Sequence, residues 1–137
     1  MDAKEFLRQV KKLDLQIKNK LIERQQWKDI ALGITASMEG ERVQSSSSQQ
    51  KMADAVVRCV DMEAEIDSLV DKLIDTKKEV VQIIEQLDSP TEYDVLHRRY
   101  IQYQSLQDVA DHYKKDYGWA TTVHGRALKH VQELLDK

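Results

Sequence analysis

The sequence is poor in the residues that turn or break a chain. It has one proline and four glycines among 137 residues, and aromatic residues make up 6%. Strand-rich folds need frequent tight turns, and a large sandwich core needs aromatic side chains, so both are disfavoured. A composition that is 33% charged and 41% hydrophobic is instead typical of long helices.

Two further absences narrow the setting of the protein. The single cysteine, Cys59, cannot form a disulfide within the chain. No hydrophobic run approaches the roughly 20 residues of a membrane span, and the first ten residues lack the apolar core of a signal peptide. We therefore expect a soluble protein in a reducing, intracellular compartment, without a membrane partner.

Apolar residues recur at steps of three and four over two long segments, which predicts two long helices. The first runs from about residue 2 to 38, with Gly33 and Gly40 marking where it can end. A polar stretch at about 39–49, with four consecutive serines, is interpreted as a loop. The second helix runs from about Gln49 to Leu87. Its heptad seam is expected at Met52, Val56, Cys59, Glu63, Ile66, Val70, Leu73, Lys77, Val80, Ile84 and Leu87.

Two long amphipathic helices of matching period can bury their apolar stripes against each other. An isolated helix would have nothing to cover its stripe. Residues 1–88 are therefore expected to form an antiparallel, coiled-coil-like hairpin. Leftover apolar residues such as Leu69, Ile74 and Val81 leave open a homodimer through the heptad helices.

The only proline separates this hairpin from a compact unit at 89–137. Ser89, Pro90 and Glu92 have the spacing of a helix start, and Ser105 with Asp108 three residues later predicts another. A final helix is expected at about 118–135. Six of the eight aromatic residues lie in this tail, enough for a small three-helix core. The fold class is thus all-α: a long hairpin followed by a three-helix unit.

The tail has the layout of a helix-turn-helix, in which a short helix and a turn precede a longer recognition helix. Ala120, Val123, Ala127, Val131 and Leu134 form the inward face of the last helix, and its outward face has no acidic residue until Glu133. Arg98 and Arg99, on the helix before the motif, could clamp phosphates, or one of them could pair with Asp94 or Asp108. Trp119 is expected either to contact DNA or to pack on Tyr113 and Tyr117. The candidate DNA-binding residues are Arg98, Arg99, Lys114, Lys115, Gly118, Trp119, Thr121, Thr122, Gly125, Arg126 and Lys129.

The segment SLQDVADHY…HGRALKHVQELL resembles the fourth conserved region of bacterial sigma factors, a promoter-reading helix-turn-helix. The likeness rests on Leu106, Asp108, Val109 and Ala110, followed by Arg126-Ala127-Leu128. In the turn, Lys114 stands where that family has a glycine. Over nearly its full length the chain is similar to ArpU-like late-gene regulators of phages and mobile elements in Gram-positive bacteria. That resemblance implies sequence-specific binding of double-stranded DNA in the host cytoplasm, at the nucleoid, and the sigma likeness implies a contact with RNA polymerase.

Two other classes of function compete with a DNA-binding regulator. One is a non-enzymatic adaptor whose sigma-like tail docks on RNA polymerase or another phage protein. The other is an enzyme, which the sequence disfavours because Cys59 occupies a heptad core position and there is no glycine-rich phosphate loop. The four histidines do not form a metal set with nearby carboxylates. We therefore expect no enzymatic activity, no cofactor and no metal.

Overall fold

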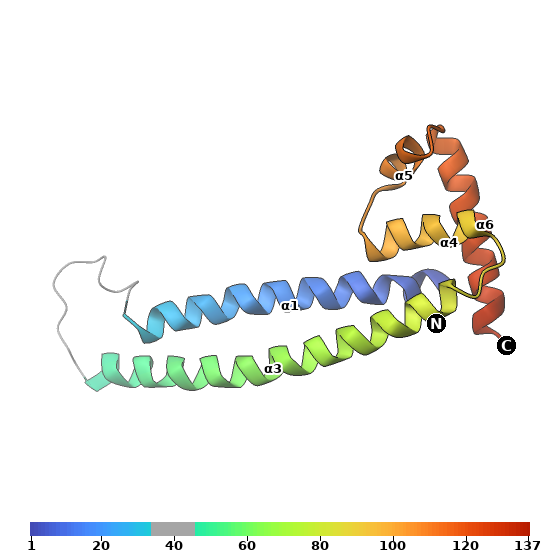
Figure 1. The fold of residues 1–137 in the computed structure, drawn as a ribbon. Coiled ribbons are helices and arrows are strands. Elements are labelled where there is room, and N and C mark those ends of the chain that lie inside the picture. Colours follow the sequence, from blue (N-terminus) through green and yellow to red (C-terminus); the bar gives the residue numbers. More distant parts are fainter. Residues whose placement is uncertain (34–45) are drawn as a thin grey trace. The chain divides into compact units, whose positions relative to one another are not determined.

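A computed structural model of the chain describes residues 1–33 and 46–137. Within these two ranges every regular element is a helix, which confirms the all-α fold class (Figure 1). None of the described helices is both long and apolar enough to cross a membrane. The elements are α1 (Ala3–Ala31), α3 (Ser46–Ile84), α4 (Pro90–Leu96), the π-helical turn η1 (His97–Ile101), α5 (Leu106–His112) and α6 (Tyr117–Leu135).

Helix α1 is shorter than the sequence pattern predicts. Its N-terminus is capped by Asp2, whose carboxylate accepts a hydrogen bond of 2.8 Å from the backbone N–H of Glu5. The helix ends at Ala31, and Gly33 follows with a left-handed φ of 71°. Glycine adopts this conformation without strain, so Gly33 stops the helix before Met38. Gly40 and the first part of the expected loop at 39–49 lie outside the described residues.

Helix α3 begins and ends three residues earlier than expected. It starts at Ser46 rather than Gln49, so the last serines of the polar stretch are helical and not part of a loop. A helix tolerates serine in its first turn, where the backbone N–H groups lack partners within the helix. At the other end, the N–H of Leu87 donates to the carbonyl of Ile84 over 3.2 Å. This tightened turn ends the helix at Ile84 and not at Leu87.

The chain divides into two compact units, and the division differs from the expected boundary at residue 88. Unit 1 comprises Met1–Asp14 and Lys72–Lys137, whereas unit 2 comprises Leu15–Asp71. The physical reason is a shared core: apolar residues from the start of α1 and the end of α3 pack with those of the C-terminal helices. Each long helix therefore contributes to both units.

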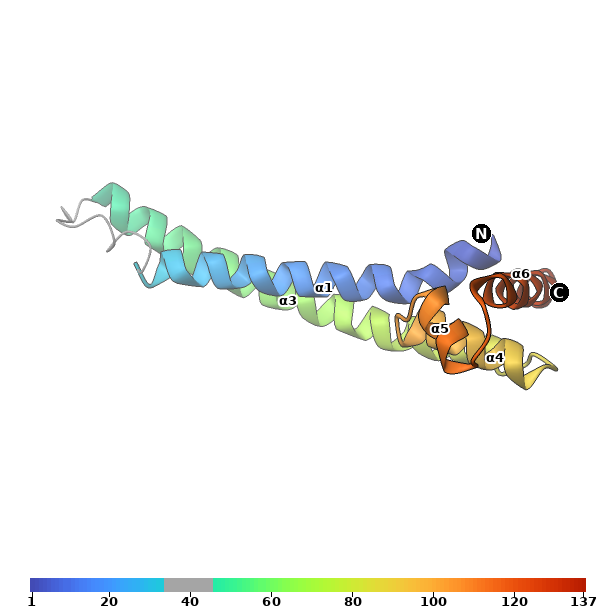
Figure 2. The same ribbon diagram turned by 90° about the horizontal axis from the view of Figure 1, so that it is seen from above.

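In unit 2, residues 15–31 of α1 pair with residues 46–71 of α3 in opposite directions (Figures 1 and 2). Lys20 Nζ lies 2.9 Å from Glu65 Oε2, and Arg24 Nη1 lies 3.9 Å from Glu63 Oε1. Cys59 Sγ contacts the carbonyl oxygen of Arg24 at 3.8 Å. Cys59 therefore faces α1 as expected, but it is only half-buried and not fully enclosed.

The buried seam of α3 differs from the predicted one at three positions, whereas Ile66, Val80 and Ile84 are buried as predicted. Glu63 and Lys77 are exposed, and Val56 exposes 52% of its surface. Their places are taken by the preceding residues, of which Ala55 and Met62 are fully buried. This register avoids placing the charged groups of Glu63 and Lys77 in the seam, where loss of hydration would cost free energy. The buried residues of α3 are Ala55, Met62, Ile66, Thr76, Val80 and Ile84.

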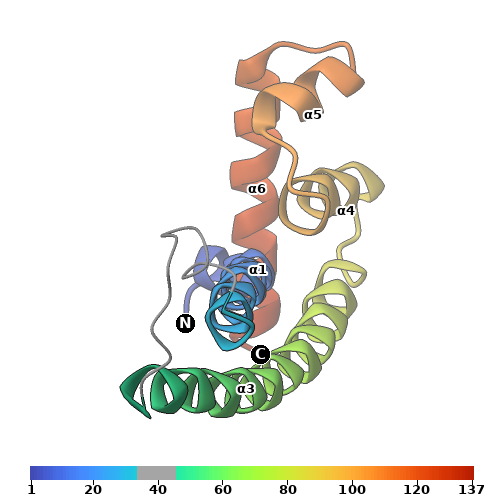
Figure 3. The same ribbon diagram turned by 90° about the vertical axis from the view of Figure 1, so that its left-hand side faces the viewer.

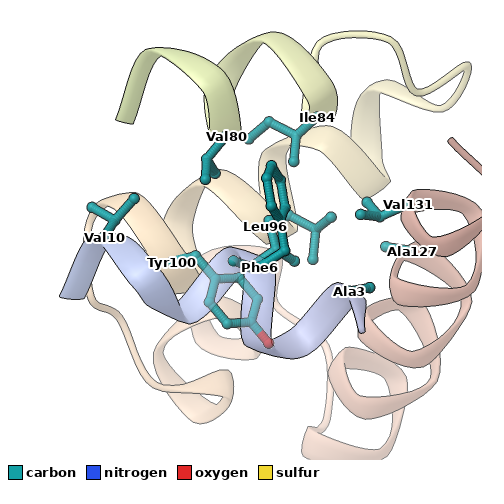
Figure 4. Packing of buried hydrophobic residues seen from close by; sticks show 10 residues of the cluster. Ala3, Phe6, Val10, Val80, Ile84, Leu96, Tyr100, Ala127 and Val131 are labelled. Atoms are coloured by element: carbon teal, nitrogen blue, oxygen red, sulfur yellow. The ribbon is translucent and has the colours of Figure 1, made fainter. Parts of the chain in front are cut away.

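The main core of unit 1 joins five helical segments (Figure 4). Leu7, Ile84 and Leu96 are fully buried in it, from α1, α3 and α4 respectively. Side chains from η1 and α6 complete the cluster. Figure 4 labels Ala3, Phe6, Val10, Val80, Ile84, Leu96, Tyr100, Ala127 and Val131.

The short helices begin where the sequence predicts. Ser89 accepts a hydrogen bond from the N–H of Glu92 at 3.2 Å, and Pro90 occupies the first helical position of α4. At α5, Ser105 and Asp108 form a complete capping box in which each side chain accepts from the other's backbone N–H. Both α4 and α5 pack against α6 (Figure 3).

Candidate nucleic-acid interface

The turn between α5 and α6 is a Schellman motif. The N–H of Lys115 donates to the carbonyl of Ala110 at 2.9 Å, and the N–H of Lys114 donates to that of Asp111 at 3.1 Å. Lys114 has a φ of 55°, so it adopts the left-handed conformation that usually favours glycine. Asp116 then caps α6 by accepting a 2.8 Å hydrogen bond from the N–H of Trp119. The two lysines are thereby held in an exposed, tightly bonded turn.

One face of α6 anchors the helix in unit 1. Ala120, Val123, Ala127 and Val131 are buried, as their spacing predicts, and Leu134 is half-buried. Ala110 and Val109 of α5 are also completely buried. A small residue at position 110 suits the close approach of α5 to α6.

The opposite face of α6 is exposed and carries small and cationic residues. Gly118, Thr122, Gly125 and Lys129 are all exposed, while Thr121 is half-exposed. The Thr121 hydroxyl donates to the carbonyl of Gly118 at 2.9 Å, so its proton is already engaged. Residues 118, 125 and 132 are seven apart and define one line along the helix.

Gly118 lies inside the first turn of α6, because the helix begins at Tyr117. A side-chain carbon at Gly118 would meet Asp116 Oδ1 at an ordinary 3.5 Å, and one at Gly125 would meet no heavy atom within 4 Å. Neither glycine is therefore required by packing within the chain.

Arg126 is exposed, and its guanidinium forms an ion pair with Glu92. Its Nε lies 3.4 Å from Glu92 Oε2, and His130 Nδ1 lies 2.6 Å from Glu92 Oε1. Glu92 is 4% exposed, so this carboxylate is enclosed between α4 and α6. The sequence pattern suggested only that Glu92 belongs to the start of α4. Its link to α6 connects residues 34 and 38 positions apart, which no local motif signals.

Arg98 and Trp119 pack inside unit 1 and are not on the exposed face of α6. Arg98 Nε donates to Asp94 Oδ2 at 2.8 Å. Trp119 is half-buried against Tyr113, with ring centroids 5.0 Å apart, so the packing alternative describes it better than DNA contact. Tyr117 is 53% exposed and adds little to that cluster.

Tyr113 and Arg98 share the carboxylate of Asp94. The Tyr113 hydroxyl donates to Asp94 Oδ2. Partial burial and this hydrogen bond raise the pKa of Tyr113 to about 12. Partial burial also raises the pKa of Asp94, but the hydrogen bonds from Tyr113 and Arg98 outweigh it, so the net shift is downward. This ionic cluster ties α4 to the end of α5.

Arg99 belongs to a different group of residues, around a buried tyrosine–histidine pair. Tyr100 Oη and His124 Nε2 are 2.7 Å apart, and His124 is 9% exposed. Burial, reinforced by the positive charges of Arg99, Lys4 and Arg8, lowers the pKa of His124 to about 4. Arg99 also donates from Nη1 to the carbonyl of Gln104 at 3.1 Å and lies over the Tyr100 ring.

The structure therefore brings together Lys114, Lys115, Gly118, Thr122, Gly125 and Lys129, with Thr121 and Arg126 at the borders of the exposed α6 face. It separates Arg98, Arg99 and Trp119 from that group. Within the described ranges, no group of three or more His, Cys, Asp or Glu residues is placed so that it could hold a metal ion. No protein-family model, curated protein or solved structure matches the chain.

Proposed function

We propose that the protein is a sequence-specific DNA-binding regulator of phage or mobile-element transcription and not an enzyme. In this proposal α5 and α6 are the helix-turn-helix, and α6 enters the major groove. The observation that carries it is the exposed face of α6, which lacks an acidic side chain from Tyr117 to Gln132 and follows two exposed lysines. A helix anchored by one buried face and cationic on the other suits a polyanionic groove.

The side chains on this face match the chemistry of duplex DNA. Threonine hydroxyls can contact base edges or phosphates, and lysine suits phosphates and guanine. The exposed backbone at Gly125 would let a base or phosphate approach more closely than any side chain allows. Thr122 and Gly125 would therefore read the groove, while Lys114, Lys115 and Lys129 would hold the phosphates on either side.

The family resemblance supports the same interpretation. The sigma-region-four pattern places its turn at residue 114, and the left-handed backbone of Lys114 has the conformation that a glycine there would provide. An ArpU-like regulator would act at the nucleoid in the host cytoplasm. A contact with RNA polymerase through the same tail remains part of the proposal, and the long α1–α3 pair would be the coiled hairpin of that family.

We also propose that unit 2 forms a homodimer, because it exposes a cluster of valines on α3. Val56, Val57 and Val60 lie within two turns of α3 and expose 52%, 60% and 61% of their surfaces. These three valines are called the unit 2 apolar surface. Unit 2 also exposes apolar side chains on α1 and just after it. They are Leu21, Ile22, Trp27 and Ile30 of α1, and Leu32, which follows α1.

The charges of unit 2 favour a second copy as the occupant of that surface. Residues 15–31 carry four lysines or arginines and two acidic residues, a net +2. Residues 46–71 carry two and six, a net −4. A two-fold dimer can place the α1 segment of one chain against the α3 segment of the other, so attraction is doubled by symmetry. Two copies would also provide two recognition helices for a palindromic site.

Genome-wide mapping of bound DNA, with the protein expressed in a bacterial host, tests the DNA-binding proposal. Thr122→Ala combined with Lys129→Ala changes the exposed α6 face and touches no buried group. Arg126 is left intact because its removal would also leave the buried Glu92 with one partner fewer. The matched control is Glu133→Ala, an exposed change near the end of the same helix.

The wild type and the control are expected to enrich the same discrete sites, and the double variant is expected to lose them. Wild-type protein that enriches no site would contradict DNA reading. Co-purification of RNA polymerase with such a protein would then establish the adaptor function instead.

A further inference from the structure

A second group of cations lies in unit 1, apart from the lysines and Arg126 of the recognition motif. Lys4, Arg8 and Lys11 follow one another at steps of four and three along α1, which places them on one face of the helix. All three side chains are exposed. The fourth cation of this group is Arg99, on η1. These four residues are called the α1 cation cluster below.

Electrostatic effects and one ring contact indicate that these charges lie near one another in unit 1. Arg99, Lys4 and Arg8 all act on the ionisation of the buried His124, and Arg99 and Arg8 also act on Tyr100. Lys11 Nζ lies 5.8 Å from the centre of the Tyr103 ring, which follows η1. Two acidic residues also lie on this part of α1: Glu5, in its first turn, and Asp14, which is hydrogen-bonded to the Tyr103 hydroxyl. The four cations outnumber these two carboxylates. Positive charge therefore dominates this surface.

The start of α1 is fixed beside the exposed line of α6. The backbone N–H of Ala3 donates to Gln132 Oε1 over 2.8 Å. Gln132 is seven residues beyond Gly125, so both lie on the same stripe of α6. The α1 cation cluster therefore begins next to the stripe that the proposed function assigns to DNA.

We propose that Lys4, Arg8, Lys11 and Arg99 form a second phosphate-binding surface that grips the backbone of the same DNA duplex from the side of α1. This inference rests on the proposed function, since it extends the α6 interface. Cations that outnumber the carboxylates around them gain from binding a polyanion, because binding releases the counterions of the phosphates. Lys4 and Lys11 would bind phosphates through their ammonium groups, and Arg8 through its planar guanidinium, without contacting the bases.

Fluorescence anisotropy with a short mixed-sequence DNA duplex, titrated at several salt concentrations, tests this surface in the full chain. Lys4→Gln combined with Arg8→Gln removes two charges while keeping helix propensity. The matched control is Lys77→Gln combined with Lys78→Gln, two exposed changes in α3 within the same unit. Both variants change the net charge equally. Arg99 is left unchanged because it also bonds to Gln104 within the fold.

The Lys4/Arg8 variant is expected to bind about tenfold more weakly and to lose about two from the slope of log Kd against log salt. The control is expected to bind as the wild type does. Equal losses in both variants, or none in the Lys4/Arg8 variant, would overturn the second surface. Wild-type protein that binds no duplex at low salt would instead refute the DNA-binding proposal itself. Unfolding by circular dichroism checks that both variants remain folded.

Discussion

At the residue scale, His124 couples folding to pH. Its pKa of about 4 lies below the ordinary value of 6.5, because burial and the nearby cations disfavour the imidazolium. Because the folded-state pKa lies below the unfolded one, the contribution of neutral His124 to the free energy of unfolding is fully present above about pH 6.5. Stability is then lost as pH falls toward 4, since the unfolded chain binds the proton more readily. Protonation of this one residue is therefore expected to favour unfolding across that window.

His124→Gln is expected to remove this component of the pH dependence. Between pH 7 and pH 5 the wild type should lose about 2 kcal/mol more free energy of unfolding than the variant. Urea denaturation at both pH values measures the difference. Other titrating groups, such as Asp94 with its lowered pKa, contribute equally to both proteins. The difference between the two proteins therefore isolates the contribution of His124. Parallel losses in the two proteins would mean that His124 is not held neutral.

Gly125 is the glycine whose presence the fold does not explain. It lies inside α6, is exposed, and has open space where a side-chain carbon would go. Gly125→Ala should therefore raise the free energy of unfolding by about 1 kcal/mol, because alanine has the better helix propensity. Affinity for DNA is expected to fall, since the methyl group would occupy the position of closest backbone approach. Chemical denaturation and anisotropy on the same sample measure both effects, and a stabilised variant with unchanged binding would remove Gly125 from the interface.

At the element scale, the features that depend on neighbouring residues could be predicted from the sequence. The caps at Ser89 and Ser105, and the buried face of α6 from Ala120 to Val131, follow local rules of spacing and hydrogen bonding. The C-terminal half of α1 is different. Its apolar repeat continues past Ala31, yet the helix ends there, because Gly33 can adopt the left-handed conformation that terminates it.

Features that depend on distant residues could not be predicted. The observed seam of α3 shares Ile66, Val80 and Ile84 with the predicted one, but it buries Ala55 and Met62 in place of Val56 and Glu63. The apolar side chain of Val56 favours the wrong position in the sequence pattern. In the same way, the support of Arg126 by Glu92 and the gathering of Lys4 and Arg8 near Arg99 join separate helices. The sequence therefore indicated the exposed face of α6 but neither its support nor the second cationic surface.

At the scale of the whole molecule, a homodimer would explain why unit 2 leaves its valines exposed. A pair of helices buries only one stripe on each, so exposed apolar residues outside that stripe gain most from a second hairpin. Dimerisation would also link two DNA-binding tails, and each tail would raise the local concentration of the other at a palindromic site. Oligomeric state and DNA affinity are therefore expected to change together.

Val57→Glu combined with Val60→Glu is expected to convert the dimer into a monomer. Each substitution places a charge where the second copy would bury an apolar side chain, and two symmetry-related copies of each charge would face the interface. Sedimentation equilibrium over a range of concentrations measures the mass. Ser68→Glu is the control, because it adds a charge at an exposed polar position of the same helix. A wild type that sediments as a monomer at every concentration would contradict the dimer, whereas dissociation of the valine variant alone would place its interface on the unit 2 apolar surface.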